Sequence, residues 1–184
     1  MKKRIFKSNN IKEDKMKELL DTYDINGNFV GVKTRAFCHG KNPGVYHKPV
    51  WIFIKNDNNE ILVQKRAKYK KENAGKWDMP SAGHVSAGET SLQACVRETE
   101  EELGLKFNEN DFVFLTQWLA QQSWELAQIY LLKTNATIDE MTLQQEEVEE
   151  VKWLSYDNFI KLLYSSDFCD FPINYKDWIA KVLK

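Results

Sequence analysis

The chain has 184 residues, with 26 basic and 27 acidic side chains and a formal net charge of −1 at pH 7. This balance excludes a global positive field for non-specific binding of a nucleic-acid polymer, although an anionic small molecule needs only a local positive pocket. The basic start MKKRIFKSNN is not followed by an apolar run, and no later segment approaches the length that spans a bilayer. We therefore expect a cytoplasmic protein without a membrane partner, built as one domain with a substantial core.

The first predicted element is a hairpin over residues 17–34. In LLDTYDINGNFVGVK, apolar and polar residues alternate around the turn pair Asn26 and Gly27, which is a strong hairpin signal. Strands are expected next at 48–55 (KPVWIFIK) and 60–66 (EILVQKR), joined by the polar turn NDNN. An exposed edge of the hairpin would permit a homodimer.

The second half of the chain combines strands and helices. A lysine-rich loop reaches Trp77, and a glycine turn at Gly83 then leads into a helix. Further strands are predicted near 112–119, 125–132 and 148–154, followed by two short helices interrupted around Pro172. The acidic run 144–155 indicates a solvated loop entering an edge strand. Three cysteines form no CxxC pair, which fits free thiols in a reducing compartment: Cys38, Cys95 and Cys169.

The central helix carries glutamates on one side. A turn of about 100° per residue places Glu101 and Glu102 within roughly 60° of Glu98, whereas Glu100 points away. Its start resembles a capping box of Thr90 and Gln93, and Gly104 is a helix stop. A neighbouring stripe is expected to be buried: Leu92, Cys95, Val96, Thr99 and Leu103.

Clustered like charges destabilise a helix unless something positive offsets them. Hard oxygen ligands in such a cluster suit Mg²⁺ or Mn²⁺ better than zinc. The alternative interpretation is a solvated acidic face. The spacing of residues decides between a metal site and a solvated face. Five residues separate Gly83 from Glu89, and seven more separate Glu89 from the segment RETEEELGL, residues 97–105.

This pattern resembles the Nudix box, and its one departure is Thr99, where the family has an aliphatic residue. The resemblance implies an α/β class fold, an α/β/α sandwich with a central mixed sheet and an N-terminal β-hairpin. We expect one domain over 1–184, with a tail at 1–16, the hairpin at 17–34, a core at 46–165 and a C-terminal helix at 166–184. The resemblance to the Nudix box also implies a hydrolase that cleaves a small organic or nucleoside diphosphate by attack of water.

A second resemblance covers QKRAKYKKENAGKWDMPSAGHV, residues 64–85, which is similar to type I isopentenyl diphosphate isomerase, a Nudix-fold enzyme. The matching positions imply a metal site built from histidines and an acidic strand residue, and a diphosphate held by Arg66 and Lys70. Seven positions match without a gap: His47, Arg66, Lys70, Trp77, Gly83, His84 and Glu102. His39 matches when the alignment is shifted by one residue, and Glu125 resembles the acidic strand residue of the isomerase. Two departures oppose isomerase activity, since Ala82 replaces the catalytic cysteine and the box keeps all three glutamates.

The resemblances assign roles within this branch of the superfamily. Glu98, Glu101 and Glu102 hold the cation, and Arg97 orients them through an i,i+4 pair with Glu101. Glu89 either supports the metal or is an ordinary acidic residue of the first turn. The general base is Glu101, Glu102 or Glu125. Substrate-side candidates are His47, His84, Lys65, Arg66, Lys70 and Lys71. The alternatives are an isomerase-like enzyme and a non-catalytic sensor of a diphosphate ligand.

Tryptophans and one phenylalanine form a last group of candidates. They could stack on a base or line an apolar pocket, although tryptophan is more often a core residue in a domain of this size. The group comprises Trp51, Phe53, Trp77, Trp118 and Trp124.

Overall fold

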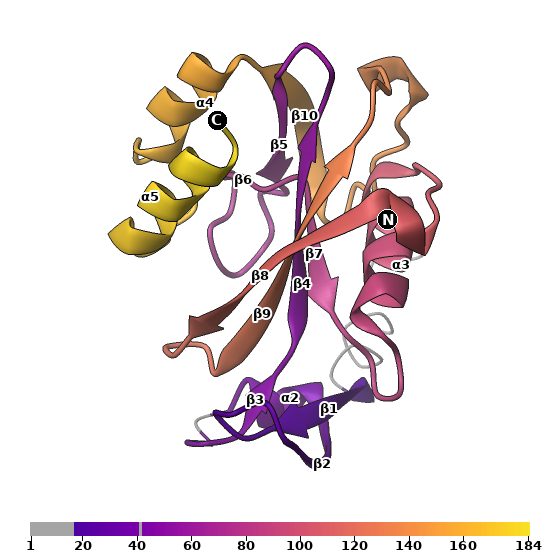
Figure 1. Cartoon of the computed structure of the whole chain (residues 1–184), viewed down its shortest axis with the longest axis vertical. Coiled ribbons are helices and arrows are strands. Elements are labelled where there is room, and N and C mark those ends of the chain that lie inside the picture. Colours follow the sequence, from indigo (N-terminus) through magenta and orange to yellow (C-terminus); the bar gives the residue numbers. More distant parts are fainter. Residues whose placement is uncertain (1–16, 41) are drawn as a thin grey trace.

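The structure, a computed structural model, describes residues 17–40 and 42–184. A strongly twisted sheet lies between helix α3 (Ser91–Leu103) on one side and helices α4 (Tyr156–Leu163) and α5 (Ile173–Val182) on the other (Figure 1). The predicted α/β/α arrangement is therefore confirmed, including the two C-terminal helices on either side of Pro172. The tail predicted at 1–16 lies outside the described residues.

The described strands form one ten-stranded sheet in which β10-β5-β4-β9-β3-β1-β2 are successive neighbours, while β6, β7 and β8 pair with β5, β4 and β9. The sheet is mixed, because β4 and β3 pair with β9 in parallel and the other pairs are antiparallel. The strands are β1 (Leu19–Tyr23), β2 (Phe29–Thr34), β3 (Tyr46–His47), β4 (Pro49–Lys55), β5 (Ile61–Arg66), β6 (Trp77–Asp78), β7 (Ser81–His84), β8 (Phe112–Ala120), β9 (Glu125–Lys133) and β10 (Val148–Leu154).

The N-terminal hairpin β1–β2 forms as predicted. In its turn, the Asp24 carboxylate accepts hydrogen bonds from the backbone N–H groups of Asn26 (2.8 Å) and Asn28 (2.9 Å). Gly27 has a φ of 83°, a conformation that favours glycine. Strand β2 ends the sheet and leaves the apolar side chains of Phe29 and Val30 exposed. The homodimer through this edge stays a prediction.

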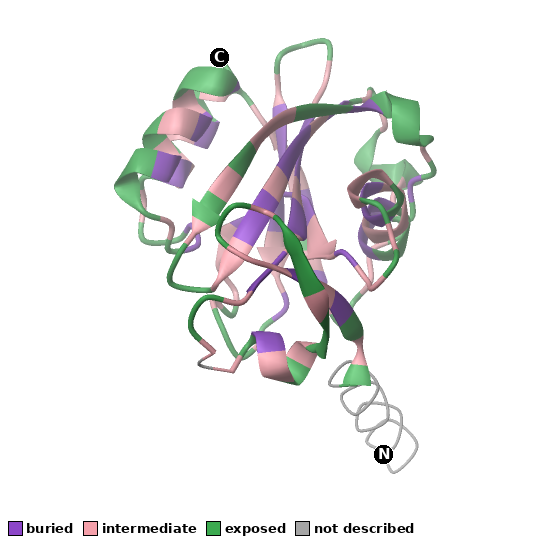
Figure 2. Cartoon of the chain, turned by 60° about the horizontal axis from the view of Figure 1, so that its bottom comes forward, coloured by how far each residue is buried: buried purple, intermediate pink, exposed green. Residues whose placement is uncertain are grey.

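Two apolar clusters fill the space on either side of the sheet (Figure 2). Alternate residues of β4 supply them: Ile52 and Ile54 pack in the cluster with α3, and Phe53 packs in the cluster with α4 and α5. This follows from the two-residue period of a strand. No helix within the described residues has the length and apolar character needed to cross a membrane.

Several short elements were not predicted: β3, β6, β7, the helix α2 (Arg35–Cys38) and the 3-10 turns Glu109–Asp111 and Ile138–Glu140. Strands of two to four residues are too short to show a period. The glycine turn predicted at Gly83 is wrong, because Gly83 lies inside β7 and pairs with Val50. The turn comes after it, where the Glu89 N–H donates to the Ser86 carbonyl. Gly83 and His84 are consequently strand residues with opposite orientations.

Candidate active site

Helix α3 begins and ends where its sequence signals predict. The Thr90 hydroxyl accepts from the Gln93 N–H (3.1 Å), and the Gln93 side chain accepts from the Thr90 N–H (3.0 Å). Gly104 ends the helix with a φ of 71°. These ends fix the helical frame, so the three glutamates lie on one side of α3, next to strand β7.

Burial is graded across the glutamate patch of Glu98, Glu101 and Glu102. The Glu101 side chain is 50% exposed, the Glu98 side chain 13%, and Glu102 as a whole residue only 6%. Of the stripe expected to be buried, Cys95, Thr99 and Leu103 are buried, while Leu92 and Val96 are half-buried. The patch therefore borders the core, and the alternative of a fully solvated acidic face does not apply to Glu102.

Gly83 allows Glu98 to approach the sheet. A Cβ atom at Gly83 would lie 1.9 Å from the Glu98 Cδ atom, far inside van der Waals contact. Any other residue would therefore displace the Glu98 carboxylate. The glycine of the sequence motif is explained by this close approach of β7 and α3.

Glu102 is a buried carboxylate with one backbone donor, the Ala82 N–H at 3.1 Å. Burial, followed by the Glu98 charge, raises the pKa of Glu102 to about 8, and the Ala82 hydrogen bond only partly opposes this rise. A buried carboxylate with this shift lacks a compensating positive charge. The donor set of carboxylate oxygens thus fits a hard divalent cation such as Mg²⁺ or Mn²⁺.

Arg97 connects the patch to its surroundings. Its nitrogens donate to Glu89 (2.9 Å, twice), Glu98 (2.6 Å) and the His84 carbonyl (2.9 Å). The predicted i,i+4 contact with Glu101 exists but is the longest, at 3.7 Å. Hydrogen bonding to Glu89 is the main cause that raises the pKa of Arg97. Arg97 is thus a fixed cation that orients Glu98 more directly than Glu101.

Glu89 lies before the helix, so it is not a residue of the first turn of α3. Its carboxylate accepts from Arg97 and from the Ser86 N–H (2.9 Å). Burial would raise the pKa of Glu89, but these hydrogen bonds outweigh it and lower the pKa. Glu89 thus supports the patch through Arg97 and braces the turn between β7 and α3.

The three histidines meet, although His39 follows α2 as its C-cap, His47 ends β3 and His84 ends β7. One ligand nitrogen of each lies within 4.8 Å of the others, and the Nε2 atoms of His39 and His84 are 2.9 Å apart. His47 is fully buried, and among the described residues neither of its ring nitrogens has a hydrogen-bond partner. Burial is the main cause that lowers the pKa of His39. Neutral imidazoles in this arrangement could hold a transition-metal ion.

Glu125 stands beside this histidine cluster at the start of β9. Its carboxylate is 3.5 Å from the His47 Nε2 atom and accepts from the Ser123 hydroxyl at 2.9 Å. The preceding residue, Trp124, has a φ of 56°, which is unusual for a non-glycine residue. The structure therefore brings together all three histidines and Glu125.

The histidine cluster and the glutamate patch lie on opposite faces of β7. Gly83 faces Glu98, and successive strand residues point to opposite sides. The two groups are also linked directly, since Arg97 donates to the His84 carbonyl. One strand thus supplies both groups.

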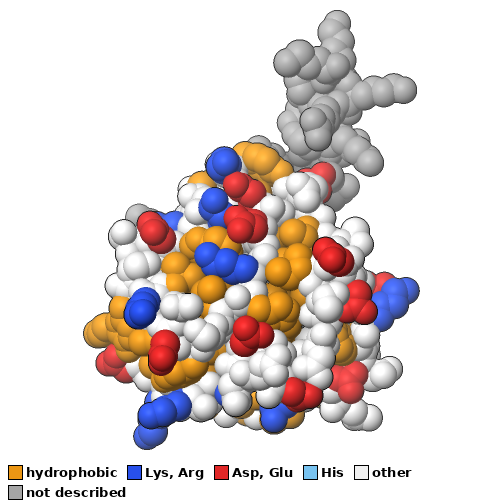
Figure 3. Space-filling model, turned by 90° about the horizontal axis from the view of Figure 1, so that it is seen from above, with side chains coloured by type: hydrophobic (Ala, Val, Ile, Leu, Met, Phe, Trp, Pro, Cys, Tyr) orange, Lys and Arg blue, Asp and Glu red, His pale blue; other side chains and the backbone are white. Residues whose placement is uncertain are grey.

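Most basic side chains near β5 are paired with carboxylates, whereas Lys71 is exposed. The acidic run forms the edge strand β10 beside β5, as predicted, but it also neutralises lysines that the sequence assigned to the phosphate side. Acidic and basic side chains are likewise interspersed on the face seen from above (Figure 3). The pairs are Lys65 and Lys68 with Glu149, Lys70 with Glu147, Lys76 with Asp170 and Arg66 with Asp78.

Sequence reasoning missed Asp78, Glu147 and Glu149 as partners of these cations. The lysines of β5 and the glutamates of β10 could have been matched across antiparallel strands, but only with the register known. Of the aromatic candidates, Trp51 and Trp118 pack against Tyr175 in the core. Trp124 packs against Tyr46.

Comparison with known proteins identifies the fold family. The NUDIX domain family model matches residues 45–170. Nudix hydrolase 3 of Arabidopsis thaliana is 37% identical over 163 residues, which cover 82% of this chain but 21% of that protein. An isopentenyl-diphosphate Delta-isomerase of Pectobacterium atrosepticum is 29% identical over 138 residues, and this alignment covers 73% of this chain and 74% of the isomerase. The crystal structure of DR0079 from Deinococcus radiodurans superposes with a TM-score of 0.69 at 19% identity, over 90% of this chain and 97% of that one.

Proposed function

The chain belongs to the Nudix family, and we propose that it is a divalent-metal-dependent hydrolase that cleaves the diphosphate bond of a small organic or nucleoside diphosphate. The observation that carries this proposal is the buried Glu102, next to Glu98, in a patch of three glutamates that Arg97 contacts through Glu98. A protein without metal chemistry has no use for so costly a cluster. The chain spans 21% of the Arabidopsis relative, so the substrate is argued from the site.

Glu98, Glu101 and Glu102 would hold Mg²⁺ or Mn²⁺. The ion, when bound, supplies positive charge to the diphosphate oxygens and acidifies water. Arg97 keeps the Glu98 carboxylate in place, and Glu89 keeps Arg97 in place. The Ala82 N–H fixes the orientation of Glu102. These contacts prepare the carboxylates before a substrate binds.

In the reaction, a water oxygen forms a bond to phosphorus, the bond from phosphorus to the bridging oxygen breaks, and a carboxylate accepts the proton of the water. Glu101 and Glu125 are the candidates for that base, and Glu102 is less suitable because it is buried. Glu101 is half exposed and 3.7 Å from Arg97, whereas Glu125 contacts His47 and Ser123. Comparing Glu101→Gln with Glu125→Gln shows which residue is the base. Substitution of the base should remove the rise in rate with pH that comes from ionisation of its carboxyl group.

The test is release of phosphate or pyrophosphate from a panel of nucleoside, sugar and isoprenoid diphosphates, with and without Mg²⁺. Wild type should show metal-dependent turnover, which Glu101→Gln should lower by roughly 10²–10³-fold. Glu100→Gln is the matched control, since Glu100 lies on the same helix, is 48% exposed and pairs with Lys106. Wild-type protein that binds diphosphates without any turnover would instead support the sensor alternative.

The histidine cluster with Glu125 favours one second candidate, an isomerase-like activity on an isoprenoid diphosphate. Ala82 opposes it, because a methyl group cannot exchange a proton. The Ala82→Cys variant, assayed for conversion between isopentenyl and dimethylallyl diphosphate, tests whether the rest of such a site is present. Absence of conversion by folded, metal-loaded Ala82→Cys would exclude this candidate.

A further inference from the structure

Asp78 is a buried carboxylate between the phosphate-side strand β5 and the C-terminal segment. One of its oxygens accepts from the Met79 N–H (2.9 Å), and the other accepts from Arg66 Nη1 (3.2 Å). Burial raises the pKa of Asp78, while the Arg66 charge opposes that rise.

Arg66 is held at two of its three guanidinium nitrogens. Nη1 donates to Asp78, and Nε donates to the Glu72 carbonyl at 3.4 Å. Within residues 17–40 and 42–184, Nη2 has no hydrogen-bond partner, and the side chain keeps 24% of its surface exposed. The guanidinium is therefore fixed along one edge and open at the other.

The backbone around Arg66 is fixed as well. Its N–H donates to the Lys76 carbonyl (2.9 Å), and its carbonyl accepts from the Gly75 N–H (3.1 Å), so the loop from β5 to β6 closes directly behind it. Neighbouring lysines differ, because each is a single flexible ammonium paired with Glu147, Glu149 or Asp170. Asp78, the partner of Arg66, has the most buried side chain of these paired carboxylates, with 11% of it exposed.

The C-terminal segment closes over Asp78 from the other side. The Trp77 N–H donates to the Asp167 carbonyl (2.7 Å), and the Cys169 N–H donates to the Trp77 carbonyl (2.8 Å). Burial, followed by the charge of Asp78, raises the pKa of the Cys169 thiol. Residues 167–169 thus pair with β6 beside the carboxylate, whose side chain is 11% exposed.

We propose that Asp78 is a positioning residue that presents the open edge of the Arg66 guanidinium to the diphosphate of the substrate, with residues 167–169 sealing the pair. The inference rests on the proposed function for the nature of the ligand. A guanidinium held on one edge loses little conformational entropy when its other edge binds phosphate oxygens. Charge-assisted hydrogen bonds of this kind are the strong ones.

Asparagine at position 78 tests the arrangement, because the shape is kept and one acceptor is lost. Two donors, the Met79 N–H and Arg66 Nη1, use the two oxygens of Asp78. Asparagine offers one oxygen and one NH₂ group. Either the Met79 N–H or Arg66 Nη1 would therefore face the NH₂ group, which is itself a donor. The Met79 N–H belongs to the backbone, and Arg66 is therefore the group that moves.

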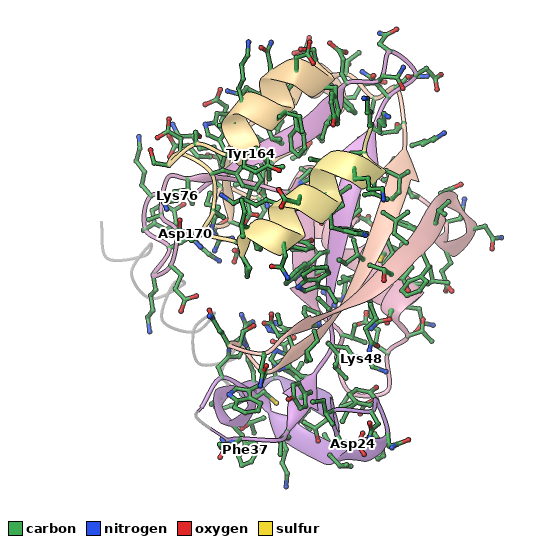
Figure 4. All side chains as sticks on the ribbon, turned by 60° about the vertical axis from the view of Figure 1, so that its left-hand side comes forward. Asp24, Phe37, Lys48, Lys76, Tyr164 and Asp170 are labelled. Carbon is green, nitrogen blue, oxygen red and sulfur yellow. The ribbon has the colours of Figure 1, made fainter. Side chains whose placement is uncertain are left out.

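The experiment measures binding of methylenediphosphonate, a diphosphate analogue that resists hydrolysis, by calorimetry in the presence of Mg²⁺. Arg66→Ala and Asp78→Asn should each weaken binding by about tenfold, and the double variant should be no weaker than either. Asp170→Asn is the matched control, because it removes a tail carboxylate that pairs with Lys76 at the surface (Figure 4). It should bind like wild type.

The double variant distinguishes a positioning role of Asp78 from general destabilisation. If Asp78→Asn merely destabilised the fold, it would weaken binding further in the Arg66→Ala protein as well. Unchanged binding by Asp78→Asn, losses that multiply to about 100-fold, or wild-type protein that does not bind the analogue would each overturn the inference. If Asp78→Asn does not fold, Asp78→Ser, with its smaller side chain, replaces it in the same comparison of single and double variants. Turnover is scored separately, so a protein that couples Asp78 to Arg66 but hydrolyses nothing refutes only the proposed function.

Discussion

The glutamate patch and the histidine cluster are built by different means around one strand. The patch comes from five consecutive residues of one helix, whereas the histidines come from three elements and span residues 39–84. Hard, charged oxygens make up the first group and softer, neutral nitrogens the second. The two would therefore select different ions, Mg²⁺ or Mn²⁺ for the patch and a transition metal for the cluster.

The two groups also differ in how they are stabilised without a metal. Arg97 and Glu89 hold the patch by charge, and Glu102 remains poorly compensated. In the histidine cluster, by contrast, His47 is completely buried, His84 is half-buried and His39 is exposed. A local substitution at either group should thus change one site and spare the other.

The largest effect is expected from Gly83→Ala. The new Cβ would lie 1.9 Å from the Glu98 Cδ, so the flexible carboxylate must move away. Turnover should fall by about 10²-fold or more, because a metal ligand is displaced, while thermal stability changes little. Assays of turnover and of thermal melting measure both.

Gly27→Ala is the control for Gly83→Ala. Nothing lies within 4 Å of its added Cβ, but its φ of 83° strains an alanine. This variant should lose stability and keep full turnover per folded molecule. Equal losses of turnover in the two variants would mean that the patch does not depend on local contact with β7.

Glu102→Gln should stabilise the metal-free protein by a few kcal/mol near pH 8. The folded-state pKa of about 8 lies above the ordinary value of 4.5, so the folded state binds more protons than the unfolded state between these values. Stability of metal-free wild type should consequently decrease as pH rises from 4.5 to 8, at up to about 1.4 kcal/mol per pH unit. Glutamine has no charge to desolvate, so its profile should lack this decrease.

Denaturant titrations across this pH range in EDTA give the free energies of unfolding. Glu101→Gln is the matched control, because that side chain is half exposed and should leave the profile unchanged. Addition of Mg²⁺ at pH 8 should stabilise wild type and not Glu102→Gln. A pH profile that is the same in wild type and Glu102→Gln would refute the burial argument.

His39→Ala should separate the two ion sites. His39 is exposed and contacts the other two histidines, so its removal should leave the fold intact. Binding of Co²⁺, followed by its visible absorption spectrum, should weaken by about 10–100-fold. Mg²⁺-dependent turnover should change by less than about tenfold, since the glutamates keep their contacts. Loss of both in parallel would mean that the two groups act as one site.

The same contrast explains what the sequence could predict. Helix α3, its capping box and the patch follow from residues a few positions apart, so local rules were sufficient. The meeting of His39, His47 and His84 was expected only through family resemblance, because strands of two and four residues show no periodicity. Asp78 and the glutamates of β10 were missed for a related reason, since cross-strand register is set by the whole sheet.

The smallest effect tests the one departure from the Nudix box. Thr99 is fully buried in α3, and its hydroxyl has no hydrogen-bond partner among the described residues. Valine has nearly the same shape and no polar group to desolvate, so Thr99→Val should raise the free energy of unfolding by about 1 kcal/mol. Thr90→Val, on the same helix, should lower it by about 1 kcal/mol through loss of the cap.

Turnover decides what Thr99 does. The residue lies on the buried stripe beside Glu98 and Glu102, one helical turn from the latter, so a functional hydroxyl would have to act through one of them. The Thr99 hydroxyl forms no hydrogen bond to either carboxylate among the described residues, and unchanged turnover in Thr99→Val is therefore expected. A stabilised but slower variant would show that the glutamate patch, unlike the histidine cluster, depends on a residue behind it.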